Sequence, residues 1–304
     1  MNDMIKKQRF GVEIEMTGLS RANAAEVVAR ELNSRVYDHI GSYDARLIKD
    51  SQGRTWKIVS DASIDTHGNG GSYAVEFVTP PLNYEDIETL QNIVRKLKEA
   101  GAKRDNSCGI HVHVDGANHT PASLRRLVNF MTARQDLIYE SLEIGARANR
   151  WCRKLNQNLL KEMKKDKNLS KTSMEQIWYS PANDNYTDGI DHQHYNSTRY
   201  HGVNLHSFFT KGTVEFRLFN STLHAGKIKA YIQFCLAVSA WAITSEDKLV
   251  FRSTAGYTAE QKVTLMRNIL THRLGLYGEE FKTCRLHLMN PLKKTAGMTV
   301  RDAA

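Results

Sequence analysis

The stretch GVEIEM, residues 11–16, alternates strictly between aliphatic and acidic side chains. Successive side chains of a β-strand point to opposite faces, so the aliphatic residues share one face and Glu13 and Glu15 share the other. The pattern therefore predicts a strand with one face suited to a hydrophobic core and one face that presents two carboxylates.

Three later segments show the same division into an aliphatic face and a selected polar face. YAVEFV at residues 73–78 presents Glu76, and TVEFRLF at 213–219 presents Glu215 and Arg217. GIHVHVD at 109–115 presents His111, His113 and Asp115. The polar positions of the four segments contain no Lys, although the chain holds 42 Lys and Arg residues. Solvent-facing strands usually carry Thr, Ser and Lys, so this composition favours a functional face over a merely wet one.

Carboxylates gathered on one face repel each other unless cations lie among them. Oxygen ligands suit Mg²⁺ or Mn²⁺ together with substrate phosphates, whereas a zinc site more often combines three His or Cys ligands. The chain has no GxxxxGK[ST] phosphate loop, and the glycine-rich turn at 67–71 leads into a strand and not into a helix. We therefore expect any nucleotide to bind on the polar sheet face.

The overall pattern predicts one α+β domain spanning residues 1–304, built on a curved, mainly antiparallel sheet with helices on its apolar face. A basic insertion is expected at about 144–200 and a helical C-terminal extension from about 245. Helices are predicted near residues 20–33, 83–100, 120–142, 227–244 and 258–274, the last two closing the chain. Further strands are predicted near 46–49, 55–60 and 202–209.

Composition sets the remaining expectations. The chain has 304 residues and a net charge of +9, which favours polyanionic partners. The run 147–171 contains nine Lys or Arg residues and two acidic ones, and it is expected to be a solvated helix, a lid or an acceptor dock. The four cysteines form no CxxC pair, and neither a signal peptide nor a membrane span is recognisable. These features predict reduced thiols and a cytoplasmic protein without a membrane partner.

Several segments, in this order, resemble the amidoligase family of the glutamine synthetase and glutamate–cysteine ligase superfamily. They span residues 10 to about 240, and they are GVEIEM (11–16), SDASI (60–64), VEFVTPPL (75–82), CGIHVHVD (108–115), RYHGVNLHSF (199–208) and TVEFRLFNSTLHAGKIKAYIQF (213–234). The resemblance implies a glutamine synthetase catalytic-domain-like fold, with ATP and two or more Mg²⁺ ions, or Mn²⁺, on the sheet face. It also implies that ATP phosphorylates a carboxylate and that an amine then displaces phosphate to form an amide.

The resemblance assigns metal ligands to positions of this chain. Glu13, His111 and Glu215 correspond to ligands of the metal on the phosphoryl path. Glu15 and Glu76 correspond to ligands of a second metal nearer the incoming amine, where Glu76 also counts as catalytic.

Other roles carried over from the family concern ATP and the substrates. His113 resembles a histidine that contacts ATP phosphates, and Arg217 an arginine that stabilises the transferring phosphoryl group. Arg199 is expected to be a second phosphate clamp and, with Arg217, catalytic. Asp61 and Ser63 resemble a substrate-binding DxS element that here reads DAS, where the family more often has glycine in the middle.

Two other functions remain open on the sequence. A metal-dependent hydrolase could use the same Glu and His residues to activate water, and a basic nucleic-acid-binding protein could have lost catalysis. For the ligase, the sequence names neither the carboxylate acceptor nor the amine donor. A peptide, a cell-wall precursor or an anionic polymer is the expected kind of substrate, and an oligomer is compatible with the sequence.

Overall fold

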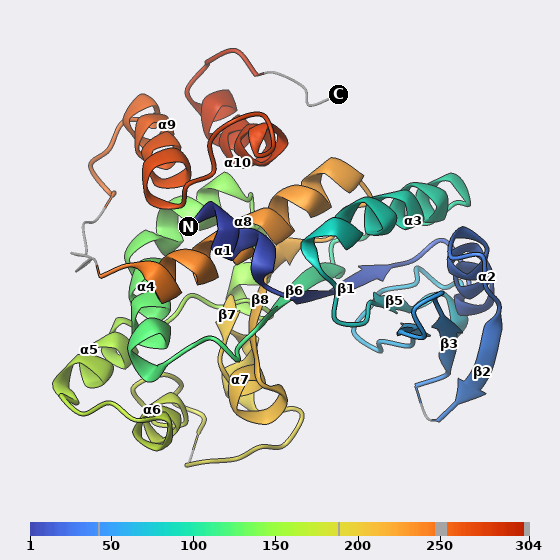
Figure 1. Cartoon of the computed structure of the whole chain (residues 1–304), viewed down its shortest axis with the longest axis horizontal. Helices are drawn as coiled ribbons and strands as arrows, with labels where there is room; N and C mark the ends of the chain where they lie inside the picture. The colour runs from blue at the N-terminus through green and yellow to red at the C-terminus, as the bar shows by residue number, and fades with distance from the viewer. Residues whose placement is uncertain (42, 188, 247–253, 301–304) are drawn as a thin grey trace. The chain divides into compact units, whose positions relative to one another are not determined.

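The computed structural model describes residues 1–41, 43–187, 189–246 and 254–300 (Figure 1). The chain divides into two compact units. The β-rich unit comprises Arg9–Val112 and Phe219–Ile232, and the helical unit comprises Met1–Gln8, His113–Leu218 and Gln233–Ala304.

The β-rich unit is built on strands in the order β2-β3-β4-β5-β1-β6. Neighbouring strands from β2 to β1 pair antiparallel, and Glu15 of β1 faces Glu76 of β5 in the register. The aliphatic face of β1 is buried as the alternation predicts, with Val12, Ile14 and Met16 at most 1% exposed. The strands are β1 (Phe10–Met16), β2 (Val36–Ile40), β3 (Ala45–Lys49), β4 (Thr55–Val59), β5 (Val75–Val78) and β6 (Gly109–Asp115), which continues into the helical unit.

Two helices of the β-rich unit, α2 (Arg21–Glu31) and α3 (Ile87–Glu99), pack against each other. The Ser20 hydroxyl accepts a hydrogen bond from the Asn23 backbone N–H and so caps α2. Asn83 and Asp86 form a capping box at the 3₁₀ turn η2 (Tyr84–Asp86), which leads directly into α3. Both predicted helix starts are confirmed. They could be predicted from the sequence because each cap depends only on residues three positions apart.

The helical unit contains the strand order β6-β8-β7, with β7 (Val203–Asn204) and β8 (Thr213–Asn220) antiparallel. Asn204 of β7 lies opposite Glu215 of β8. Its helices are α1 (Asn2–Lys7), α4 (Pro121–Ser141), α5 (Gln157–Lys165), α6 (Lys171–Trp178), α7 (His206–Lys211), α8 (Ala225–Thr244), α9 (Ala259–Asn268) and α10 (Lys282–Thr295), of which α8 begins in the β-rich unit. Shorter turns are η3 (Gly145–Asn149), η4 (Ser197–Tyr200) and a π-helical turn, η5 (Ile269–Arg273).

The predicted strand at 202–209 is wrong beyond Asn204, the third residue of that range. Only Val203 and Asn204 pair with β8, after which the chain turns into α7. Gly212 ends that helix in the left-handed conformation, at φ 76°, which glycine adopts without steric cost. Because of this short helix, the Ser207 side chain lies beside Thr213 at the start of β8.

The prediction that two helices close the chain is also wrong, because α10 follows them. Pro291 lies inside α10, where proline donates no backbone hydrogen bond, and none of the predicted helix ranges reaches it. The strand β2 and the short helices α1 and α6 were not predicted either, since the segments are short or amide-rich and show little periodicity. The helix α5 lies within the run 147–171, for which a solvated helix is one of the three expectations.

The observed architecture confirms the predicted α+β class, with antiparallel strand pairing and packed helices. All four cysteines are buried and free, as expected for reduced thiols. No helix in the described part of the chain combines the length and the apolar character needed to cross a bilayer. The predicted domain boundaries, including the extent of the basic insertion, stay predictions.

Candidate active site

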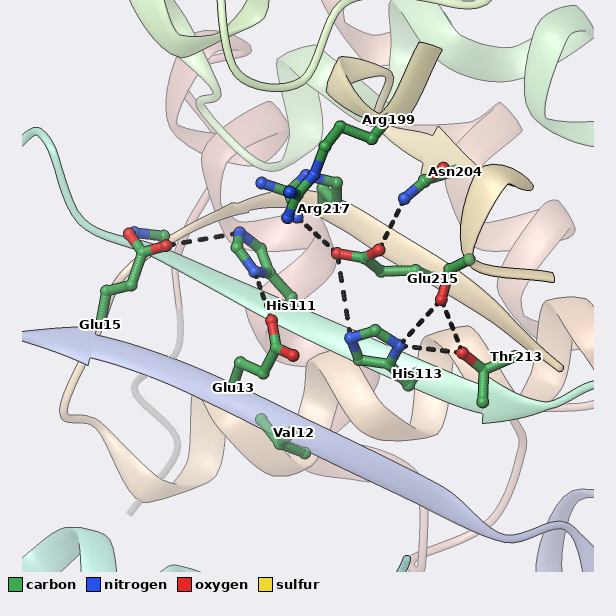
Figure 2. Close-up of polar contacts among 12 residues, drawn as sticks. Val12, Glu13, Glu15, His111, His113, Arg199, Asn204, Thr213, Glu215 and Arg217 are labelled. Carbon is green, nitrogen blue, oxygen red and sulfur yellow. Dashed lines mark hydrogen bonds and ion pairs between the residues drawn. The ribbon is translucent and has the colours of Figure 1, made fainter. Parts of the chain in front are cut away.

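The β-rich unit gathers Glu13, Glu15, Glu76 and His111, which we call the carboxylate cluster. Adjacent strands bring these residues together: two lie on β1, one on β5 and one on β6. Glu15 and His111 are only 4% and 3% exposed. Figure 2 shows His111 directed toward both Glu13 and Glu15. The polar face that the alternation predicts is therefore a partly buried cluster and not a fully wet surface.

Glu15 is held in place by groups far away in the sequence. The Gly109 backbone N–H donates to Glu15 Oε2 at 2.5 Å, and the Ser221 hydroxyl donates to the Glu15 carbonyl oxygen at 2.6 Å. The first bond orients the carboxylate, and the second holds the backbone of β1 at the same residue. Neither Gly109 nor Ser221 was predicted as a site residue, because nothing in the local pattern indicates these long-range contacts.

The two ring nitrogens of His111 face two different carboxylates. Nδ1 lies 2.9 Å from Glu13 Oε2, and Nε2 lies 3.6 Å from Glu15 Oε1. When Nδ1–H donates to Glu13, the Nε2 lone pair of the neutral ring points at the Glu15 carboxylate. Such an arrangement favours a cation at Nε2, and a carboxylate on the other nitrogen is the usual partner of a metal-binding histidine.

The cluster meets the geometric requirement for a metal ion. Glu15, Glu76 and His111 each offer a ligand atom, and these atoms all lie within 4.8 Å of one another. Two carboxylates and one imidazole form an oxygen-rich donor set, which suits Mg²⁺ or Mn²⁺ better than structural zinc. Burial raises the pKa of the Cys108 thiol, next to Gly109, to about 11, so this thiol is protonated at neutral pH and is not an ionic ligand.

The helical unit contains a second polar group around Glu215, which we call the guanidinium cluster: His113, Asn204, Glu215 and Arg217. The Arg217 Nη1–H donates to Glu215 Oε1 at 2.6 Å, and the Asn204 Nδ2–H donates to Glu215 Oε2 at 2.6 Å (Figure 2). Glu215, Arg217 and Asn204 are 3%, 6% and 1% exposed. The two short bonds hold the Glu215 carboxylate on both oxygens and orient the guanidinium.

His113 belongs to this cluster through β6. Its Nε2 lies 3.8 Å from Glu215 Oε1, and its Nδ1 lies 3.0 Å from the Thr213 hydroxyl. Ser207 on α7 adds a hydroxyl 2.8 Å from that of Thr213. The sequence did not indicate Thr213 or Ser207 as site residues. For Ser207 the reason is that a strand is predicted over 202–209, where the structure has the helix α7.

Arg199 and Arg217 both lie near the ring of Tyr200. Their guanidinium carbons are 5.6 Å and 5.9 Å from the ring centroid, within the range of cation–π attraction. Arg199 is further anchored by an Nη1–H that donates to the His194 carbonyl oxygen at 2.6 Å. Tyr200 therefore joins the two predicted phosphate clamps, a role that the sequence did not indicate.

Asp61 and Ser63 lie in the β-rich unit at a turn after β4. The Ser63 backbone N–H donates to Asp61 Oδ1 at 2.7 Å, which closes an Asx turn at the surface. The turn occupies one Asp61 oxygen and leaves the Ser63 side chain exposed. Its substrate-binding role stays a prediction, as does the grouping of Glu215 with Glu13 and His111 around one metal.

The chain belongs to the family described as "putative amidoligase enzyme", whose model matches residues 6–239. This confirms the predicted family and supports a ligase-type enzyme. Among solved structures, the chain is similar to a bifunctional glutathione synthetase from Pasteurella multocida, with 12% identity and a TM-score of 0.38. The match covers 97% of this chain and 49% of that chain, so the chain spans about half the length of that structure. No curated protein sequence matches the chain.

Proposed function

We propose that the chain is an ATP-dependent carboxylate–amine ligase that forms an amide through an acyl phosphate. The observation that carries this proposal is the group of Glu15, Glu76 and His111, whose ligand atoms lie within 4.8 Å of one another and of which Glu15 and His111 are buried. In the same proposal the fold is of the glutamine synthetase catalytic-domain type, with the acidic strand face as its active side. Family membership supports the ligase class, and the donor set supports the metal.

Glu15, Glu76 and the Nε2 atom of His111 would hold one Mg²⁺, or Mn²⁺ in its place. Bound there, the ion supplies positive charge that offsets the charge of ATP phosphates and of the carboxylate acceptor. Glu13 has two compatible roles, since one of its oxygens is bonded to His111 Nδ1. Through that oxygen Glu13 would orient the ring, and its carboxylate would also serve as a ligand of a second ion.

The chain's own cations provide the rest of the phosphoryl-transfer machinery in this proposal. A free carboxylate is a poor electrophile, because it has no leaving group, and transfer of a phosphoryl group to it supplies one. Arg217 would bridge two oxygens of that group with its planar guanidinium. Glu215 holds the guanidinium in its orientation through the 2.6 Å bond, so little reorganisation is needed when charge develops.

Arg199 and His113 would contribute to ATP binding. Arg199 shares the Tyr200 ring with Arg217, which keeps both guanidinium groups near one aromatic ring. His113 is oriented by the Thr213 hydroxyl on Nδ1, so its Nε2 is directed toward Glu215 or a phosphate oxygen. Glu76, like Glu13, is partly exposed, so an incoming amine could approach it from solvent.

The test is to incubate the protein with ATP, Mg²⁺ and pools of carboxylates and amines, and to quantify all nucleotide products. We expect ADP and phosphate in equal amounts, with formation dependent on a carboxylate and abolished by EDTA. The Glu76→Gln variant should lose activity, whereas Glu99→Gln on the exposed end of α3 should not. Release of AMP and pyrophosphate would refute phosphoryl transfer to the acceptor. Metal-dependent cleavage of a substrate without ATP would replace the ligase with a hydrolase.

A further inference from the structure

A hollow lined by several cationic side chains lies in the C-terminal part of the helical unit, beyond the family-matched residues 6–239. It has a volume of about 510 Å³ and is formed by α9, the turn η5 and α10, the helices at the red end of Figure 1. Its lining contains four cationic side chains, one hydroxyl and two apolar side chains, and no acidic one: Arg267, Thr271, Lys282, Arg285, Leu286, Met289 and Lys293.

The cations are arranged by helical periodicity. Lys282, Arg285, Met289 and Lys293 are spaced three, four and four residues apart on α10, so they share one face of that helix. Arg267 is contributed by α9, which packs against α10. Three charges on one helix face and a fourth on the neighbouring helix therefore line one hollow. Met289, which is buried, lines it as well.

Few of these charges are neutralised by acidic side chains. Lys282 pairs with Glu279 at 3.1 Å, and both side chains are more than half exposed, so that pair is screened by water. Arg285 is instead positioned by a backbone carbonyl, since its Nη1–H donates to Leu276 O at 2.8 Å. Within residues 254–300 and the other described ranges, neither Arg267 nor Lys293 has an acidic side chain at salt-bridge distance. Like charges this close oppose one another unless an anion is bound among them.

An irregular backbone turn contributes to the lining of the hollow. Residues Ile269–Arg273 form a π-helical turn directly after α9, and such turns occur often at functional sites. The Thr271 hydroxyl donates to the Arg267 carbonyl oxygen at 2.8 Å, and Thr271 also lines the hollow. An ordinary continuation of α9 would present different residues to α10.

We propose that this hollow binds a small molecule that carries two or more phosphate groups. The two guanidinium groups match phosphate oxygens in pairs, and the two ammonium groups add charge without demanding a geometry. The volume lies in the range of about 300–1,000 Å³ that is typical of small-molecule sites. Leu286 and Met289 provide apolar contact for an uncharged part of the ligand. The site does not depend on the proposed function, because none of its residues belongs to the carboxylate or guanidinium cluster.

The probe is inorganic tripolyphosphate, titrated calorimetrically in EDTA so that metal-dependent binding elsewhere is absent. We expect saturable binding with a stoichiometry of one and an affinity that falls as salt is raised from 50 to 200 mM. The variant Arg267→Gln/Lys293→Gln should bind at least about tenfold more weakly, because each phosphate contact contributes to the salt-dependent affinity. The charge-matched control Lys161→Gln/Lys164→Gln, on the exposed face of α5, should bind like the parent.

Further arms of the experiment separate the sources of the signal. Arg217→Gln should leave tripolyphosphate binding unchanged, which separates this hollow from the guanidinium cluster. Metal-free ATP that binds more tightly than tripolyphosphate, with adenosine itself inactive, would identify the ligand as a nucleotide; equal affinities would identify a polyphosphate. Melting curves of the variants report whether they fold. The proposal is overturned if the parent does not bind, if both double variants bind equally, or if only single-stranded RNA binds.

Discussion

The Glu15→Gln substitution separates a metal-binding carboxylate from a structural one. Glutamine keeps the shape of the side chain and an oxygen that can accept the Gly109 N–H, but it removes the charge. If the carboxylate cluster exists to hold a cation, the metal-free variant should be about as stable as the parent protein, while its affinity for Mg²⁺ should collapse.

The magnitude follows from two opposing terms. The ligand atoms of Glu15 and Glu76 lie within 4.8 Å of each other, which gives a repulsion of about 3 kcal/mol at an effective dielectric of about 20. Partial exposure of Glu76 reduces the relief to about 1–2 kcal/mol. Against this, the 2.5 Å bond from Gly109 changes from charge-assisted to neutral, which costs about 1 kcal/mol. The free energy of unfolding of the metal-free protein should therefore stay within about 1 kcal/mol of the parent.

The effect of Mg²⁺ should differ strongly between the two proteins. At a concentration 100 times its Kd in the parent, Mg²⁺ adds about 2.7 kcal/mol to the free energy of unfolding. Changes to partners of metal ligands commonly weaken binding by about 10–100-fold, so loss of a ligand is expected at the upper end. A 100-fold weaker Kd leaves only about 0.4 kcal/mol of stabilisation at the same concentration.

Urea unfolding with and without Mg²⁺ measures both quantities in one series. Glu99→Gln is the matched control, because it removes a carboxylate of the same unit whose side chain is exposed and pairs with Lys96 on the same helix. This control should keep the full response to Mg²⁺. The reasoning is refuted if Glu15→Gln retains that response, or if the metal-free variant loses about 3 kcal/mol, as it would if Glu15 only served the fold.

Two other predictions concern Arg217 and His119. Arg217→Lys keeps the charge but loses the planar fork, so kcat should fall by about 10²–10³ with little change in the melting temperature; near-normal turnover would place Arg217 outside the active site. Burial, with a smaller contribution from Arg126, lowers the pKa of His119 from 6.5 to about 4. The folded protein therefore binds fewer protons than the unfolded chain between pH 6.5 and 4, and this residue should make stability fall across that window as the pH decreases, by up to about 3 kcal/mol. His119→Gln should flatten urea-unfolding stability over the same window, and an unchanged slope would show that His119 does not titrate on unfolding.

Much of the framework follows from local patterns. The alternation in residues 11–16 predicts both the buried face of β1 and the two carboxylates opposite it, and each prediction needs only the geometry of an extended chain. The caps at Ser20 and at Asn83 with Asp86 likewise predict where helices begin. Because these patterns repeat on four strands, the polar face and its acids could be identified before any contact was known.

The partners of those acids were decided by the tertiary structure alone. Glu15 is bonded to Gly109, 94 residues away, and His113 to Thr213, 100 residues away. Neither partner has a distinctive local pattern, since a backbone N–H and a hydroxyl occur throughout the chain. The register of strand pairing determines which of these groups meets the acid, because a shift of one residue would turn each side chain to the other face.

The short helix α7 and the basic hollow illustrate the same limit. The segment after Asn204 has hydrophobic residues compatible with a strand. In the structure its pairing with β8 ends at Asn204, and the following residues form the helix α7. The cations of α10 share one face by helical spacing, and Arg267 joins them only because α9 packs against that helix. The sequence by itself determined which residue types share a face, because that depends on the local chain. The packing of distant segments determined what those faces meet, because that depends on contacts between residues many positions apart.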